Sequence, residues 1–145
     1  MFKRILLPTD GSEQSERAIL AGIRFAKDLG AEVVGLTVIP KFHAFTYKTE
    51  MLEDTKSEYA VDSRKHADEY LKFISGAAQE AGVPCSTESA ISDDPYQMII
   101  STARDRHCDL IVMGSHGRRG VKGVLLGSET QKVLVHGSIP VLVYR

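Results

Sequence analysis

The chain has 145 residues, of which 43% are hydrophobic and 26% are charged, and its formal net charge is −1. This composition is typical of one globular domain, excludes a disordered chain and argues against a general nucleic-acid binder, which carries a strong basic excess. With no apolar run long enough to span a bilayer, no signal-peptide pattern and only two cysteines, Cys85 and Cys108, we expect a cytosolic protein without a disulfide framework.

The first predicted elements are a strand, a helix and a second strand. Residues 3–7, KRILL, end in three apolar side chains that a proline closes, which predicts a strand ending near Leu7. Asp10 or Ser12 then caps a helix whose apolar side chains recur on one face, and Gly30 ends it. Residues 32–39, EVVGLTVI, are apolar and β-branched, which predicts the second strand.

The middle of the chain has a less regular pattern. Residues 40–56 show no clear period, and we expect an irregular loop there. Helical periodicity returns over residues 57–81, with apolar side chains on one face and charges on the other. A weak strand over residues 85–91 follows. Asp94 and Pro95 then predict a helix start, because Asp is a good cap and Pro is favoured at the first helical position.

The last third adds a strand over residues 109–113, a helix over residues 128–136 and a strand over residues 140–144. Strands and helices therefore alternate from the first element to the last. The strands are apolar along their whole length, which indicates a parallel sheet covered on both faces in one α/β domain. In an open sheet of this kind, ligands bind outside the carboxyl ends of the strands.

The most unusual stretch is residues 113–130, MGSHGRRGVKGVLLGSET, which holds five glycines directly after a predicted strand. Glycine lets the backbone adopt positive φ and lets a ligand approach closely, and exposed N–H groups ahead of a helix form an anion site. Ser128 and Thr130 add hydroxyl donors, and Arg118 is one of three basic side chains there. The stretch predicts a phosphate-binding loop; a surface loop with solvated charges is the alternative.

The spacing of these glycines is distinctive. It does not fit the P-loop pattern or G-x-G-x-x-G. Its fixed positions are Gly114, Gly117, Gly127 and Ser128, which match the G-x2-G-x9-G-S/T pattern of the nucleotide-binding universal stress proteins. The resemblance covers the whole chain, because the opening KRILLPTDGSEQSERAI and the ending HGSIPVLVYR are also similar to that family.

This resemblance implies a Rossmann-like, doubly wound sheet of five parallel strands in the order 3-2-1-4-5, with helices on both faces and ATP bound at the carboxyl edge, together with Mg²⁺. On the adenosine side the implied residues are Pro8, Thr9, Asp10 and Val38, with Asp10 near the ribose and the backbone of Val38 at the adenine. The implied loop and phosphate residues are Met113, Gly114, Ser115, His116, Gly117, Arg118, Gly127, Ser128, Glu129 and Thr130.

Two positions depart from the family pattern. Glu129 stands where the family often has a small apolar residue, and a carboxylate beside phosphates repels them unless it points away or meets a metal. Asp93 stands where the family usually has glycine before Asp-Pro, so we expect that turn to differ.

The resemblance implies a cytosolic, nucleotide-dependent regulator or sensor of a stress response. Two other functions stay open on the sequence. One is a slow ATP hydrolase, for which Asp10 and Glu129 are the local candidate bases. The other is a nucleotide-free interaction protein of the same fold, which the complete glycine spacing disfavours.

Three further kinds of site are disfavoured by particular residues. Asp10 after a strand also resembles the opening of haloacid-dehalogenase-type phosphatases, but Pro8 stands where their nucleophile would be. The isolated His and Cys residues do not supply the four ligands of a zinc site. The sequence has no G-x-S-x-G motif, the turn that exposes a nucleophilic serine in α/β-hydrolases.

The last strand ends in an apolar edge, which favours pairing with another chain. In the family that this chain resembles, the fifth strands pair across a two-fold axis. We therefore predict a homodimer through Val141, Leu142 and Val143, with an edge buried inside the monomer as the alternative.

Overall fold

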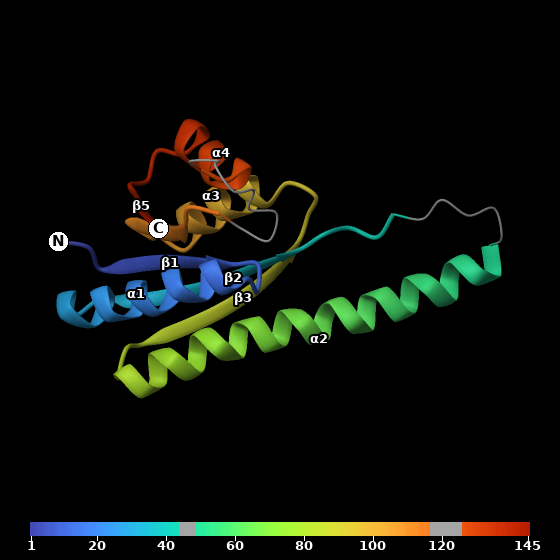
Figure 1. Ribbon diagram of the computed structural model, residues 1–145, viewed down its shortest axis with the longest axis horizontal. Helices are drawn as coiled ribbons and strands as arrows, with labels where there is room; N and C mark the ends of the chain where they lie inside the picture. Colours follow the sequence, from blue (N-terminus) through green and yellow to red (C-terminus); the bar gives the residue numbers. More distant parts are fainter. Residues whose placement is uncertain (44–48, 117–125) are drawn as a thin grey trace.

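The computed structural model describes residues 1–43, 49–116 and 126–145, with side chains in the second of these segments from residue 55 onward. Strands and helices alternate along the chain (Figure 1). The strands are β1 (Arg4–Thr9), β2 (Glu32–Ile39), β3 (Cys85–Ile91), β4 (Leu110–Gly114) and β5 (Val141–Tyr144). The helices are α1 (Glu13–Leu29), α2 (Thr49–Ala81), α3 (Pro95–Asp105) and α4 (Ser128–His136).

The five strands form one sheet in the order β3-β2-β1-β4-β5, and every neighbouring pair is parallel. This confirms the expected doubly wound α/β fold and its strand order. Because all strands run the same way, their carboxyl ends meet at one edge, which we call the carboxyl edge. The strand order reverses between β1 and β4, so the segments that follow these two strands run in opposite directions. The crevice between them is where sheets of this kind bind ligands.

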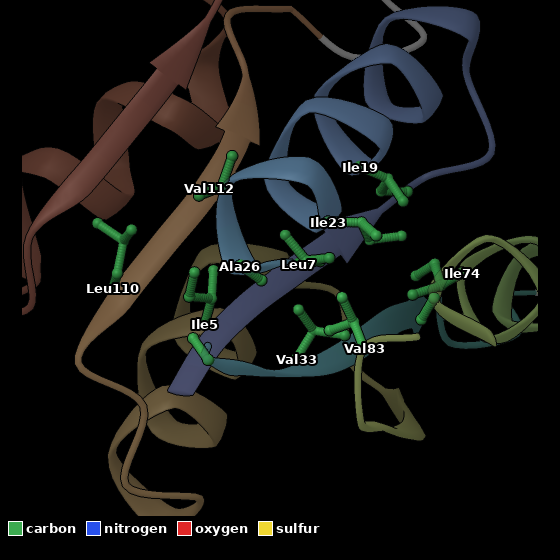
Figure 2. Close-up of a cluster of buried hydrophobic side chains, with 12 residues drawn as sticks. Ile5, Leu7, Ile19, Ile23, Ala26, Val33, Ile74, Val83, Leu110 and Val112 are labelled. Atoms are coloured by element: carbon green, nitrogen blue, oxygen red, sulfur yellow. The ribbon is translucent and has the colours of Figure 1, made fainter. Parts of the chain in front are cut away.

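Two apolar cores cover the two faces of the sheet. Ile5 and Leu7 of β1 point toward α1 and α2, as Figure 2 shows for this core, whereas Leu6 belongs to the core under α3 and α4. Successive residues of a strand point to opposite faces. A strand buried on both faces is therefore apolar at every position, which explains the unbroken apolar runs in the sequence.

Helix α1 begins and ends as its sequence predicts. Ser12, rather than Asp10, is the cap, because its side-chain oxygen accepts the N–H of Ser15 at 3.2 Å. Gly30 ends the helix with φ +66°, a left-handed conformation that glycine adopts at little cost.

The first strand is longer than expected. The sequence places its end near Leu7, but β1 continues through Pro8 to Thr9 and pairs with β2 over its whole length. Proline lacks an N–H, but the pairing of β1 with β4 ends at Leu6. The missing donor therefore interrupts no ladder on that side of the strand.

The second helix also begins earlier than expected. The sequence predicts a loop up to about residue 56, whereas α2 starts at Thr49. Apolar periodicity comes from packing, and residues 55–58 are all exposed, so no periodic stripe marks this part of the helix. Figure 1 shows the amino-terminal half of α2 projecting past the sheet. Within the described residues, no helix has the length and apolar character that crossing a membrane requires.

Two helical glycines provide a test of this packing. A Cβ atom added at Gly22 of α1 would lie 2.6 Å from Leu7 Cδ2 and 3.3 Å from Val112 Cγ1, whereas one added at Gly76 of α2 would meet nothing within 4 Å. We expect Gly76→Ala to raise the free energy of unfolding by about 0.5–1 kcal/mol. Gly22→Ala should lower it by about 1–2 kcal/mol, because the overpacking outweighs the gain in helix propensity. Urea unfolding of both variants measures the difference; equal gains would contradict the close approach of α1 to the sheet.

Candidate functional site

The segment after β1 is held at the carboxyl edge by three hydrogen bonds. Thr9 Oγ1 accepts the N–H of Gly11 at 3.1 Å, and the Thr9 carbonyl accepts the hydroxyl of Thr37 on β2 at 3.0 Å. Asp10 Oδ1 accepts the N–H of Ser12 at 2.9 Å. The main chain around Asp10 is therefore fixed, and its carboxylate is held beside the first turn of α1.

Gly11 and Tyr70 belong to this site although the sequence did not single them out. Gly11 has φ +78°, and a Cβ atom there would lie 2.2 Å from two atoms of the Tyr70 ring. The loop after β1 thus lies directly against an aromatic ring of α2. One feature of the sequence could have indicated this contact, a glycine next to the predicted helix cap.

The segment after β4 is anchored through Ser115. Its N–H donates to the Tyr144 carbonyl at 2.8 Å, and its carbonyl accepts the N–H of Gly127. Its hydroxyl lies 2.9 Å from Nδ1 of His116. Ser115 is only 2% exposed, so its side chain fixes the loop from inside. It does not face solvent as a nucleophile would.

Gly114 and Thr130 form a further contact between the end of β4 and the start of α4. Thr130 is buried, and its hydroxyl donates to the Gly114 carbonyl at 2.9 Å. A Cβ atom at Gly114 would lie 3.1 Å from Gln14 Cγ and 3.3 Å from both the Gln14 and His116 carbonyl oxygens. A hydroxyl has one hydrogen, so Thr130 in this arrangement orients the loop and has no proton left to donate to a phosphate.

The amino terminus of α4 opens at the carboxyl edge. Gly127 is its N-cap, in extended conformation and without a side-chain capping bond. The first bond of the helix runs from the Gln131 N–H to the Gly127 carbonyl, so the N–H groups of the first turn have no partner within the helix. Ser128 is exposed beside them. Such a terminus carries partial positive charge and favours an anion.

Glu129 points away from that terminus. Its Oε2 accepts the N–H of Tyr96 at 2.9 Å, in the first turn of α3, and its Oε1 lies 3.4 Å from Lys132 Nζ. Asp94 occupies the N-cap position of α3 but makes no side-chain capping bond there, contrary to the expectation from sequence. Glu129 therefore caps α3 from the neighbouring helix, which explains how a carboxylate fits next to an anion site. The same bonds argue against Glu129 as a base for hydrolysis and leave Asp10 as the local candidate.

The other predicted residues divide by accessibility. Pro8 is buried, Met113 is 7% exposed within the core under α3 and α4, and Val38 packs against that core, so the main chain is what these positions can present at the edge. Gly117 and Arg118 lie outside the described residues, as do Arg119, Gly120, Lys122 and Gly123. Among the described residues, no three His, Cys, Asp or Glu side chains gather to hold a metal ion.

The two cysteines lie away from this site, at the amino ends of strands. Cys85 is the first residue of β3, and Cys108 precedes β4. Burial raises the pKa of both thiols, that of Cys108 to about 11. Both remain protonated at neutral pH, which disfavours thiolate chemistry.

Comparison with known proteins identifies one family. The profile of the universal stress protein family matches residues 1–145. Universal stress protein MJ0531 of Methanocaldococcus jannaschii is 33% identical over 145 residues, which covers all of this chain and 83% of that protein.

Solved structures agree with this assignment. The structure of MJ0577 superposes with a TM-score of 0.83 at 31% identity, covering 99% of this chain and 95% of the other. A universal stress protein from Archaeoglobus fulgidus in complex with dAMP superposes with a TM-score of 0.68, covering 100% of this chain and 98% of the other. Its identity of 16% shows a shared fold only.

The capping role of Glu129 gives a prediction for stability. Glu129→Ala leaves the N–H of Tyr96 without its acceptor, so we expect the free energy of unfolding to fall by about 1–2 kcal/mol. Glu129→Gln keeps an acceptor and should cost less. Asp94→Ala is the matched control and should change stability by no more than about 0.5 kcal/mol. Urea unfolding distinguishes them; if Asp94→Ala costs as much as Glu129→Ala, the assignment of the cap is wrong.

Proposed function

Because this chain belongs to the universal stress protein family, we propose that it binds ATP with Mg²⁺ at the carboxyl edge of its sheet and acts as a nucleotide-dependent regulator or sensor of a stress response. The observation that carries this proposal is the terminus of α4. A glycine without a side-chain cap begins that helix at the edge where the strand order reverses, so an anion can take the place of the missing cap.

The adenosine half of the nucleotide would lie beside β1 and β2. Asp10, held by its bond to Ser12, would accept a hydrogen bond from the ribose. The main chain of Val38, near the carboxyl end of β2, would contact the adenine. Support for the base comes from the Archaeoglobus fulgidus protein of the same fold, which was solved with the adenine nucleotide dAMP.

The phosphates would lie at the first turn of α4. The N–H groups of that turn and the hydroxyl of Ser128 are the donors that we assign to them. Gly114, Ser115 and Thr130 would act indirectly, by fixing the loop through the bonds described above. His116 lies beside Ser115 at the start of the glycine-rich stretch, where Gly117 and Arg118 would add backbone and charge contacts.

Magnesium would bind together with the nucleotide. Mg²⁺ usually keeps several waters and takes ligands from substrate phosphates with few protein side chains. The ion would reduce the charge of the phosphates.

We also propose a homodimer formed through β5. This strand is at one edge of the sheet, and Leu142 and Tyr144 are 36% and 37% exposed. Val141, Leu142 and Val143 would form the contact, with unpaired backbone groups joining a second copy. A cytosolic location is the corresponding expectation from composition.

Binding of ATP should stabilise the protein measurably. At about 100 times its dissociation constant, a ligand that binds only the folded state adds about 2.7 kcal/mol, which for a chain of this size raises the unfolding temperature by roughly 5–10 °C. We expect this shift with millimolar Mg-ATP in a thermal unfolding experiment. Mass spectrometry of the denatured protein as purified should also detect adenine nucleotide. The proposal fails if neither signal is found.

Ser128→Ala tests the phosphate assignment separately. Hydrogen bonds to charged groups contribute about 1.5–3 kcal/mol, so we expect affinity for ATP to fall by roughly tenfold or more. Affinity for adenosine, which has no phosphate, should not change. Ser138→Ala, an exposed serine beyond α4, is the matched control in the same calorimetric titration. Equal losses for ATP and adenosine would count against the phosphate role.

The dimer has its own test. Light scattering should give a mass twice the 15.9 kDa of one chain at micromolar concentration. Leu142→Lys places a charge on the edge strand and should produce monomers that remain folded by circular dichroism. A single-chain mass for the unaltered protein would exclude the β5 dimer.

A further inference from the structure

The turn between β3 and α3 holds the chain where it leaves β2. Asp93 Oδ1 accepts the N–H of Lys41 at 3.0 Å, and Asp93 Oδ2 lies 2.7 Å from Nε2 of His43. Next to it, the N–H of Ser92 donates to the Ile39 carbonyl at 2.9 Å. The two oxygens of one carboxylate thus bind two residues of the same segment, Pro40–His43, which we call the base-side segment.

Helix α2 holds the same segment through aromatic side chains. The Tyr59 hydroxyl donates to the Pro40 carbonyl at 2.6 Å. The rings of Tyr59 and Phe42 lie 5.4 Å apart at a tilt of 49°. The base-side segment is therefore held by the β3–α3 turn through hydrogen bonds and by α2 through Tyr59.

The contacts of Asp93 are specific to that residue. Its neighbour Asp94 carries the same charge at the next position but makes no side-chain capping bond. Hydrogen bonding to His43 is the main cause that lowers the pKa of Asp93, so the carboxylate is ionised at neutral pH. Glycine, which the family resemblance leads one to expect at this position, has no side-chain oxygen to make either bond.

We propose that Asp93 is a positioning residue that fixes the base-side segment and thereby sets the preference for adenine over guanine nucleotides. This inference rests on the proposed function. The segment starts two residues after Val38, where the main chain would meet the base. Adenine presents an amino donor where guanine presents a carbonyl acceptor, so main-chain groups can distinguish the two bases only if their path is fixed.

Calorimetric titration of the full chain with Mg-ATP, Mg-GTP and inorganic tripolyphosphate tests the inference. Asp93→Ala should weaken ATP binding about three- to tenfold. This range is expected when the ligand must itself order the base-side segment on binding. The ratio of ATP to GTP affinity should fall as well, and tripolyphosphate affinity should match that of Asp94→Ala. Asp94→Ala is the control because it removes the same charge and should leave the nucleotide ratio unchanged.

Variants of His43, the partner of Asp93, provide a second test that leaves Asp93 in place. His43→Gln retains an N–H donor for Asp93 and should behave as the unaltered protein, whereas His43→Ala should shift the nucleotide ratio in the direction of Asp93→Ala. Hydrogen exchange at Lys41 without nucleotide should become faster in Asp93→Ala.

The outcomes separate the two proposals. If the unaltered protein binds no ATP, the proposed function fails and the inference fails with it. If it binds ATP but Asp93→Ala and Asp94→Ala have the same nucleotide ratio, the inference alone is overturned. An equal loss of ATP and tripolyphosphate affinity in Asp93→Ala would also overturn it, because the effect would not lie on the base side.

Discussion

The arrangement of the carboxyl edge depends on the two backbone hydrogen bonds of Ser115. One peptide unit after β4, its N–H binds the end of β5 and its carbonyl binds Gly127 at the start of α4. The side chain of Gln14 joins the first contact by donating to the same Tyr144 carbonyl at 3.2 Å. Strand β4, strand β5 and helix α4 are therefore placed relative to one another by backbone groups. Side chains add to this arrangement, because the Thr130 hydroxyl donates to the Gly114 carbonyl and the buried Ser115 side chain fixes the loop from inside.

Two helix termini at the same side of the sheet are treated differently. Helix α3 receives the carboxylate of Glu129, whereas α4 begins with a glycine and no side-chain cap. Both termini carry partial positive charge, which Glu129 neutralises at α3, and the terminus of α4 is the one that we propose binds the phosphates. The acidic residue that looks misplaced in the sequence is thus bound to the helix beside the proposed phosphate site.

Much of the fold follows from local pattern, and the failures have a common cause. Strand β2 and helix α1 have the predicted bounds. For β2 the apolar, β-branched run gives the bounds, and for α1 the apolar period agrees with the capping residues. The start of α2 is missed because the sequence shows no apolar period there, and the first residues with described side chains, 55–58, are all exposed. Asp94 has the right residue type for a cap, but Glu129 lies 35 positions away in sequence and takes that role. Contacts of Asp93 and Tyr70 cannot be foreseen, because they depend on how α2 and the turns meet in space.

The projecting part of α2 gives the molecule an uneven distribution of stability. Of residues 55–66, only Tyr59 and Ser63 are even partly buried, whereas Ala67, Ile74 and Ala78 are anchored in the core. Helical turns without packing are marginal in water, so we expect this half of the helix to open locally while the sheet stays folded. Tyr59 stands on that half and binds Pro40 at the base side. Local opening of this half of α2 is thereby linked to the order of the chain leaving β2, through the Tyr59 hydroxyl and its ring contact with Phe42.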